Sequence, residues 1–136
     1  MRKIPRGLFV HENLRPSAYQ DEPLPIGCRQ AITPPFLVAY MIEALALKAA
    51  DRVLEIGTGT GYQTAVLAEM VSEVLTVELY PELAEAARKT IAGLGYTNVK
   101  FRTGDGTEGW AEEAPFDAIV VTAAPAGLPA ALPAQL

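Results

Sequence analysis

Cysteine is almost absent from this sequence, with Cys28 the single example among 136 residues. An intrachain disulfide is therefore excluded, and so is the repeated cysteine spacing of zinc fingers, and no metal site is expected. No run of about 18 apolar residues occurs, so neither a membrane span nor a membrane partner is expected. The basic residues 1–6 lack the apolar region of a secretory signal. These absences predict a cytoplasmic protein.

Basic residues are also scarce, with 11 Lys and Arg against 16 Asp and Glu, a net charge of −5 and a pI of about 4.8. This balance argues against a nonspecific phosphate-binding surface, so no nucleic-acid partner is expected. The only histidine, His11, lies in a proline-rich segment. The length and the 50% hydrophobic content are typical of one globular domain with a protein or small-molecule substrate.

The chain divides by composition into a proline-rich segment, residues 1–35, and a core, residues 36–136. Proline restricts its neighbours, so the first segment is expected to be extended or turning chain packed over the rest of one domain. Thr33 followed by Pro34 predicts an N-cap and a helix to about residue 47. The residues expected to face the core from this helix are Phe36, Leu37, Tyr40, Met41, Ala44 and Leu45.

Strand and helix patterns alternate after this first helix. Short apolar runs predict strands, and the longer segments between them, one of them opened by Pro81, predict helices. This alternation indicates right-handed βαβ units and a parallel sheet. The alanine- and proline-rich end, residues 123–136, could be a short helix with loops. The expected strands are 52–56, 74–78, 99–102 and 116–122, and the expected helices are 61–70 and about 81–91.

A glycine-rich turn, G-T-G-T-G at residues 57–61, follows the first core strand. Glycine tolerates positive φ and lets a ligand approach the backbone. A dinucleotide fingerprint needs glycine at the sixth position, which is Tyr62, and a P-loop needs a Gly-Lys pair, which the chain lacks. The S-adenosylmethionine turn, an acid before G-x-G-x-G, fits with Glu55 as the acid.

The acid favours S-adenosylmethionine as the cofactor, because a carboxylate would repel a pyrophosphate but is compatible with a sulfonium and an ammonium. Glu78 ends the next strand, where an acid accepts hydrogen bonds from ribose hydroxyls. Asp105 follows the third strand and can accept from the adenine amino group. The predicted cofactor-binding residues are Glu55, Gly57, Thr58, Gly59, Thr60, Gly61, Glu78, Asp105 and Gly106.

Several segments resemble the protein-L-isoaspartate O-methyltransferase family. Residues 23–35, PLPIGCRQAITPP, are similar to a segment specific to that family, which reads close to PLPIG-x-G-Q-T-I-S-x-P. Arg29 stands where bacterial members usually have glycine, Ala31 replaces a threonine, and Thr33 replaces a serine. Further similar segments are Phe9-Val10 with Ala18-Tyr19, residues 53–68, residues 104–106 with Gly109-Trp110, residues 115–117 and residues 121–124.

The resemblance implies methyl transfer from S-adenosylmethionine to the free carboxylate of L-isoaspartyl residues in damaged proteins, which is a repair reaction. Thr33 would take the catalytic role beside that carboxylate, within a substrate side formed by Gln30, Ala31, Ile32 and Thr33. The implied fold is the Rossmann-like α/β fold of class I S-adenosylmethionine methyltransferases. Its sheet would contain strands in the order 3-2-1-4 with the later strands missing, because the family continues past Leu136 and begins before this chain.

Two alternatives stay open at this stage. Arg29 and Ala31 could mark a methyltransferase with a different acceptor, with Arg29 either obstructing the pocket or pointing outward. The length could instead indicate a non-catalytic, cofactor-binding fragment. The sequence predicts neither the oligomeric state nor which proteins are repaired.

Overall fold

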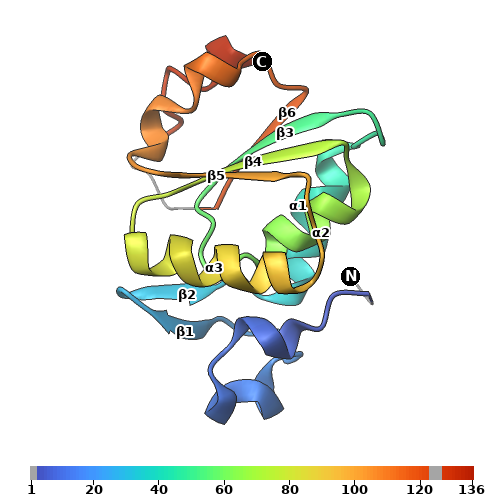
Figure 1. Cartoon of the computed structure of the whole chain (residues 1–136), viewed down its shortest axis with the longest axis vertical. Coiled ribbons are helices and arrows are strands. Elements are labelled where there is room, and N and C mark those ends of the chain that lie inside the picture. The colour runs from blue at the N-terminus through green and yellow to red at the C-terminus, as the bar shows by residue number, and fades with distance from the viewer. Residues whose placement is uncertain (1–2, 123–126) are drawn as a thin grey trace.

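A parallel four-stranded sheet forms the centre of the computed structural model, which describes residues 3–122 and 127–136. Its strands lie in the order β5-β4-β3-β6, which is the predicted order 3-2-1-4 (Figure 1). All three pairs of neighbouring strands run parallel, and in the central strand Leu54 pairs with Leu75 on one side and with Ile119 on the other. The strands are β3 (Arg52–Ile56), β4 (Glu73–Glu78), β5 (Val99–Thr103) and β6 (Ala118–Val121).

Three helices accompany the sheet: α1 (Pro35–Leu45), α2 (Tyr62–Met70) and α3 (Pro81–Gly93). The last two connect successive parallel strands, which confirms the predicted βαβ alternation to within a few residues at each boundary. Pro81 occupies the first turn of α3, where its missing N–H costs nothing.

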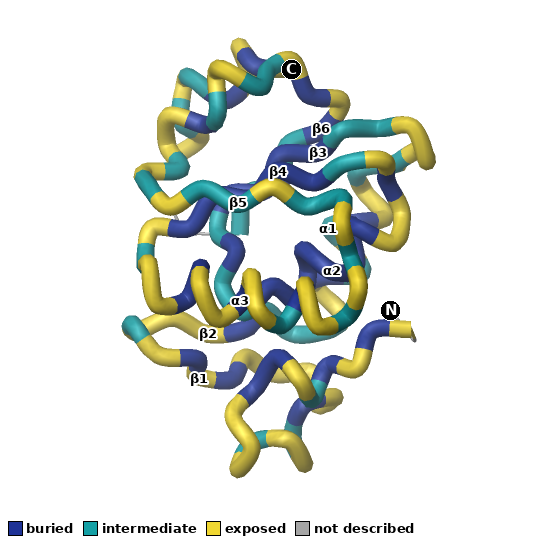
Figure 2. The backbone as a smooth tube through the Cα atoms, viewed as in Figure 1, coloured by how far each residue is buried: buried dark blue, intermediate teal, exposed yellow. Residues whose placement is uncertain are grey.

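Each face of the sheet packs into its own apolar cluster. Val53 and Val74 face the helices and the N-terminal segment, whereas Leu54 and Leu75 on the opposite face pack toward the C-terminal turns. Figure 2 shows the buried colour concentrated along β3 and β4, the two central strands. A strand covered on both faces needs a continuous apolar run, which explains the sequence pattern.

An antiparallel hairpin, formed by β1 (Leu24–Gly27) and β2 (Gln30–Ile32), lies within the proline-rich segment. It is preceded by the short 3-10 helices Arg6–Phe9 and Glu12–Ser17. The hairpin was not predicted, because its strands are too short to show an alternating pattern and one of them contains Pro25. Its two-residue turn holds Cys28 at φ 51° and Arg29 at φ 58°.

Two expectations about α1 are wrong. The N-cap position is Pro34 rather than Thr33, and the Phe36 N–H in the first turn is met instead by the Asp21 carboxylate, over 3.2 Å. The buried side chains of α1 are those of Val38 and Ile42, because a helix that is apolar all round does not reveal its buried face by periodicity. Four residues of the predicted core stripe are exposed: Phe36, Leu37, Tyr40 and Ala44.

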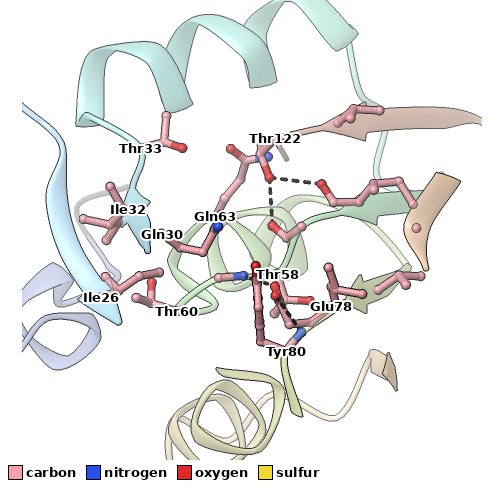
Figure 3. Close-up of a pocket in the computed structure, with 18 of the residues that line it drawn as sticks. Ile26, Gln30, Ile32, Thr33, Thr58, Thr60, Gln63, Glu78, Tyr80 and Thr122 are labelled. Atoms are coloured by element: carbon pink, nitrogen blue, oxygen red, sulfur yellow. Dashed lines mark hydrogen bonds between the residues drawn. The ribbon is translucent and has the colours of Figure 1, made fainter. Parts of the chain in front are cut away.

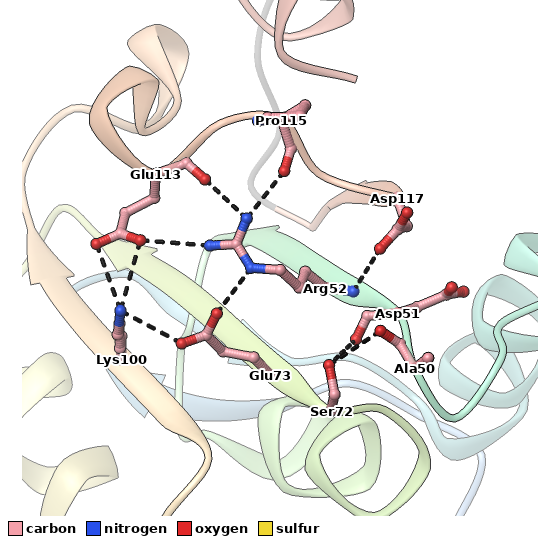
Figure 4. Close-up of polar contacts among 9 residues, drawn as sticks. All are labelled: Ala50, Asp51, Arg52, Ser72, Glu73, Lys100, Glu113, Pro115 and Asp117. Carbon is pink, nitrogen blue, oxygen red and sulfur yellow. Dashed lines mark hydrogen bonds and ion pairs between the residues drawn. The ribbon is translucent and has the colours of Figure 1, made fainter.

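A charged cluster ties the strands together at the amino end of β3 (Figure 4). The Arg52 guanidinium pairs with Glu73 over 2.8 Å and with Glu113 over 3.3 Å. Its Nη1 also donates to the backbone oxygens of Glu113 and Pro115, at 2.9 and 3.0 Å. Lys100 of β5 contacts both carboxylates. The hydrogen bond from Arg52 is the main reason that the pKa of Glu73 is lowered.

The C-terminal end packs back on the loop after β5. Gln135 accepts from the Trp110 N–H and donates to the Glu108 oxygen, each over 2.9 Å. The predicted short helix in this region is the 3-10 turn Pro133–Gln135, while residues 123–126 lie outside the described part. Within residues 3–122 and 127–136, no helix has the length and apolar character needed to cross a membrane.

Candidate functional site

A cavity of about 370 Å³ opens between the hairpin and the carboxyl ends of β3, β4 and β5. This is the place where open α/β sheets bind ligands. Figure 3 shows that β2 and α1 supply one wall, with Thr33 between them, and that the glycine turn and Glu78 supply the facing wall. Eleven of the predicted site residues line it: Gln30, Ala31, Ile32, Thr33, Gly57, Thr58, Gly59, Thr60, Glu78, Asp105 and Gly106.

Glu78 organises the glycine turn. Its Oε2 accepts from the Gly59 N–H over 2.8 Å, and its Oε1 accepts from the Tyr80 N–H over 3.2 Å. The side chain is largely buried and lines the cavity. Each carboxylate oxygen keeps a further lone pair, so the group can hold the turn and still accept hydrogen bonds from a ligand diol.

Two of the predicted glycines are explained by packing. A Cβ on Gly61 would lie 3.1 Å from the Ala87 Cβ, so this glycine lets α2 and α3 approach each other, and it does not line the cavity. A Cβ on Gly106 would lie 2.4 Å from Ile56 Cγ2. Gly106 does line the cavity, but the sheet itself requires a glycine there.

Asp105 stands at the carboxyl end of β5, as predicted. Its Oδ1 accepts from the Thr107 N–H over 2.9 Å and from the Thr107 hydroxyl over 2.8 Å. These hydrogen bonds lower the pKa of Asp105, with the backbone N–H as the main cause. The carboxylate is therefore ionised at neutral pH, and its hydrogen bonds to Thr107 use only Oδ1, which leaves Oδ2 as a further acceptor.

The assignment of Glu55 as a cofactor contact needs correction. Glu55 is completely buried beneath the turn and does not line the cavity. Its Oε1 accepts from the hydroxyls of Thr64 and Thr76, the latter over 2.8 Å, and Thr76 is joined in turn to the Thr58 hydroxyl. Burial is the main cause that raises the pKa of Glu55 to about 7. Glu55 therefore supports the turn from below.

Thr33 presents a hydroxyl to the cavity from the wall that β2 and α1 supply. No hydrogen bond of this hydroxyl is formed within residues 3–122 and 127–136, whereas the Thr33 backbone oxygen accepts from Arg6 Nη2 over 2.9 Å. Arg6 is completely buried and lies 4.6 Å from the centre of the Tyr62 ring. Burial is the main cause that lowers the pKa of Arg6. The backbone at Thr33 is thus held while its hydroxyl is left for a ligand.

Arg29 does not enter the site. It is exposed in the hairpin turn and does not line the cavity, although its neighbours Gln30 and Ala31 do. Of the two orientations considered from the sequence, the structure has the outward one.

Several further residues line the cavity without having been predicted, among them Gln63, Leu79, Tyr80 and Thr122. Leu79 is 59% exposed although it is apolar and directly follows Glu78, a placement typical of a side chain that covers a flat ligand. The Thr122 hydroxyl donates to the backbone oxygens of Ile56 and Gly57. The position next to Glu78 could have revealed Leu79, but nothing in the sequence pattern singles out Gln63.

The residues present fit S-adenosylmethionine. Glu78 and Asp105 are the charged residues among the described lining, which also includes apolar side chains such as Ile56, Val77 and Leu79. The site offers acceptors for a diol and for an amine, which suit an adenosine group without phosphates. These acceptors lie next to a glycine turn whose φ angles are 97°, 56° and 90° at Gly57, Gly59 and Gly61.

Comparison with known proteins agrees with this geometry. The chain is 57% identical over 136 residues to a protein-L-isoaspartate O-methyltransferase of Gloeobacter violaceus and 54% identical to one of Syntrophus aciditrophicus. It spans 66% and 62% of the length of those two relatives.

Solved structures show the same fold. A protein-L-isoaspartate O-methyltransferase matches 98% of this chain and 45% of its own length, at 32% identity and a TM-score of 0.85. A methyltransferase of Thiobacillus denitrificans in complex with S-adenosyl-L-homocysteine matches 66% of this chain and 37% of its own, with 27% identity and a TM-score of 0.56. The predicted Rossmann-like class I S-adenosylmethionine methyltransferase fold is confirmed.

The family model described as protein-L-isoaspartate(D-aspartate) O-methyltransferase matches residues 1–136. The chain therefore belongs to the protein-L-isoaspartate(D-aspartate) O-methyltransferase family.

Proposed function

We propose that this protein transfers a methyl group from S-adenosylmethionine to the free carboxylate of L-isoaspartyl residues in damaged proteins. The observation that carries the proposal is the division of one cavity into two ends. Glu78 supplies acceptors across the cavity from the Thr33 hydroxyl, which is a donor. Asp105 follows β5, the strand next to the one that Glu78 ends, and also lines the cavity. Family membership and the S-adenosyl-L-homocysteine complex of a structural relative support the same cofactor.

Glu78 would accept hydrogen bonds from the ribose hydroxyls, and Asp105 Oδ2 would accept from the adenine amino group. Leu79 would cover the adenine ring, and the turn at Gly57 and Gly59 would leave room for the amino-acid end. When bound, S-adenosylmethionine would supply a methyl group activated by its sulfonium charge.

The acceptor needs no general base, because a carboxylate with an ordinary pKa near 4 is already ionised at pH 7. The work of the protein is to align the acceptor and to exclude water. The Thr33 hydroxyl would fix one carboxylate oxygen by donating a hydrogen bond. The apolar neighbours Ile32 and Val38 would keep water from the reacting groups.

We further propose that residues 1–35 cover the substrate side and residues 36–136 form the cofactor-binding core of one domain. The contribution of Gln30, Ala31 and Ile32 to the cavity wall supports this division. Proteins containing isoaspartyl residues would be the partners. The free thiol of Cys28 is compatible with a reducing, cytoplasmic location.

The proposal is tested by incubating the full-length protein with cofactor labelled on the methyl group and an isoaspartyl peptide. A methyl ester is labile to base, so the label should be released as methanol at alkaline pH. Base-stable label in the peptide would indicate a different acceptor atom. Calorimetry with S-adenosyl-L-homocysteine should show binding that weakens at least about tenfold in a Glu78→Ala variant, because charged hydrogen-bond acceptors are lost.

A further inference from the structure

Gln63 carries a buried amide that its surroundings do not explain. The residue is 7% exposed, yet within residues 3–122 and 127–136 neither Oε1 nor Nε2 has a hydrogen-bond partner. Buried amides normally bond to protein groups or to a ligand. Gln63 also lines the cavity, so the unmatched donor and acceptor belong to the site.

The amide lies at the Thr33 end of the cavity, where the carboxylate that accepts the methyl group would bind. Figure 3 shows the Gln63 side chain rising from the start of α2 into the space between Thr33 and Thr122. The Thr122 hydroxyl already donates to the Ile56 and Gly57 oxygens. Thr33 and Gln63 keep donors to spare at this end, whereas Gln30 Nε2 already donates to the Cys28 oxygen.

A carboxylate would have to bind at this end. The charged side chains of the described cavity wall, Glu78 and Asp105, are both anionic, and Lys, Arg and His are absent from that wall. The substrate carboxylate would be repelled by Glu78 and Asp105. It would instead favour neutral donors near the amino end of α2, where the helix dipole is positive.

We propose that Gln63 recognises the isoaspartyl group through both ends of its amide, an inference that rests on the proposed function. Nε2 donates to the acceptor carboxylate opposite Thr33, and Oε1 accepts from the acceptor's own backbone N–H. In an isoaspartyl residue the free carboxylate and that nitrogen sit on the same carbon. A normal aspartyl residue places its free carboxylate one carbon further away, so it cannot match both ends of the amide in the same position.

The test compares two substrates: an isoaspartyl peptide and the same peptide methylated on the isoaspartyl nitrogen, which removes the N–H. The full-length protein and its Gln63→Met variant are assayed with both for kcat/KM. The wild type should lose about tenfold on the methylated peptide, and Gln63→Met should lose about tenfold or more on the unmodified one. The variant should then be nearly indifferent to methylation. Gln20→Met, a change at an exposed position, should behave as the wild type.

Two further readouts separate this role from others. The Kd for S-adenosyl-L-homocysteine should stay within about threefold in Gln63→Met, and its Tm should not fall, because an unmatched buried amide is removed. The inference would be overturned if methylation of the peptide lowered kcat/KM equally for the wild type and the variant. It would also be overturned if Gln63→Met lost as much affinity for S-adenosyl-L-homocysteine as it lost in kcat/KM. A lowered Tm together with the same loss of kcat/KM on both peptides would overturn it as well. If the wild type methylates no isoaspartyl peptide, the proposed function fails, and this inference with it.

Discussion

The guanidinium of Arg6 donates a hydrogen bond from Nη2 to the backbone oxygen of Thr33 over 2.9 Å. The two residues are far apart in the sequence, and Arg6 also donates from Nε to the Ala18 oxygen. The buried Arg6 thus joins the N-terminal segment to the residue that begins the helix side of the cavity. This contact holds the backbone from which the Thr33 hydroxyl projects.

Arg6→Lys should lower both stability and turnover. A lysine ammonium cannot reproduce the planar fork that reaches two carbonyl groups at once, so at least one buried oxygen loses its partner. We expect the free energy of unfolding to fall by about 2 kcal/mol, measured by urea denaturation, and kcat to fall more than cofactor affinity. The exposed Arg15, whose Nε donates to the Gly7 oxygen over 3.2 Å, offers a matched control. Equal effects of Arg15→Lys and Arg6→Lys would contradict this account.

Thr33→Val should remove activity without removing stability. Valine keeps the shape but loses the hydroxyl, which caps no helix in this structure. We expect kcat/KM for the isoaspartyl peptide to fall about tenfold or more, while Thr33→Ser retains most of it. The free energy of unfolding should change by less than about 0.5 kcal/mol. A loss of about 1 kcal/mol, typical of a removed N-cap, would show that the hydroxyl has a structural role instead.

Glu55→Gln should change how stability depends on pH. Below the ordinary pKa of 4.5 the wild-type carboxyl is protonated in both states, and between 4.5 and about 7 it is ionised mainly in the unfolded chain. Wild-type stability from this group therefore falls as pH rises through that window, by about 3 kcal/mol at most, and is constant above it. The variant lacks this loss. Urea titrations from about pH 4.5 to about pH 8 should therefore show its free energy of unfolding rising relative to that of the wild type. A constant difference across that range would rule out the raised pKa.

Arg29→Gly should stabilise the protein. Arg29 has φ 58° in the hairpin turn, a left-handed conformation that favours glycine by about 1 kcal/mol. Its exposed side chain makes no contribution to the cavity wall, so the strain is the main term, and thermal and urea unfolding should both report a gain. Ala31→Gly, in the extended strand β2, should instead lose about 0.5–1 kcal/mol. A loss in both variants would contradict this explanation.

The strands and the glycine turn could be predicted because both depend on local patterns, whereas the sheet order 3-2-1-4 was implied by the family resemblance. Apolar runs mark β3 and β4, and a glycine turn after a strand restricts the ligand. Glu78 and Asp105 followed from the rule that ligands bind at the carboxyl ends of parallel strands. Cofactor chemistry was therefore accessible from a single sequence.

The remaining features depend on contacts that a linear pattern does not contain. Glu55 was misassigned because its strand position turns the side chain away from the cavity, where the hydroxyls of Thr64 on α2 and Thr76 on β4 donate to it. Gln63 was missed because its amide is distinctive only through the absence of partners around it in the described chain. Thr33 was expected to cap α1, but the helix begins one residue later than predicted.

The most direct test of the account is the rate of labelled methyl transfer by the full-length protein to an isoaspartyl peptide and to its normal-aspartyl twin. The two peptides have the same composition and charge, so only the position of the free carboxylate differs. The account predicts rapid, base-labile labelling of the isoaspartyl peptide and none of the twin above background. Equal labelling of both, or of neither, would contradict it.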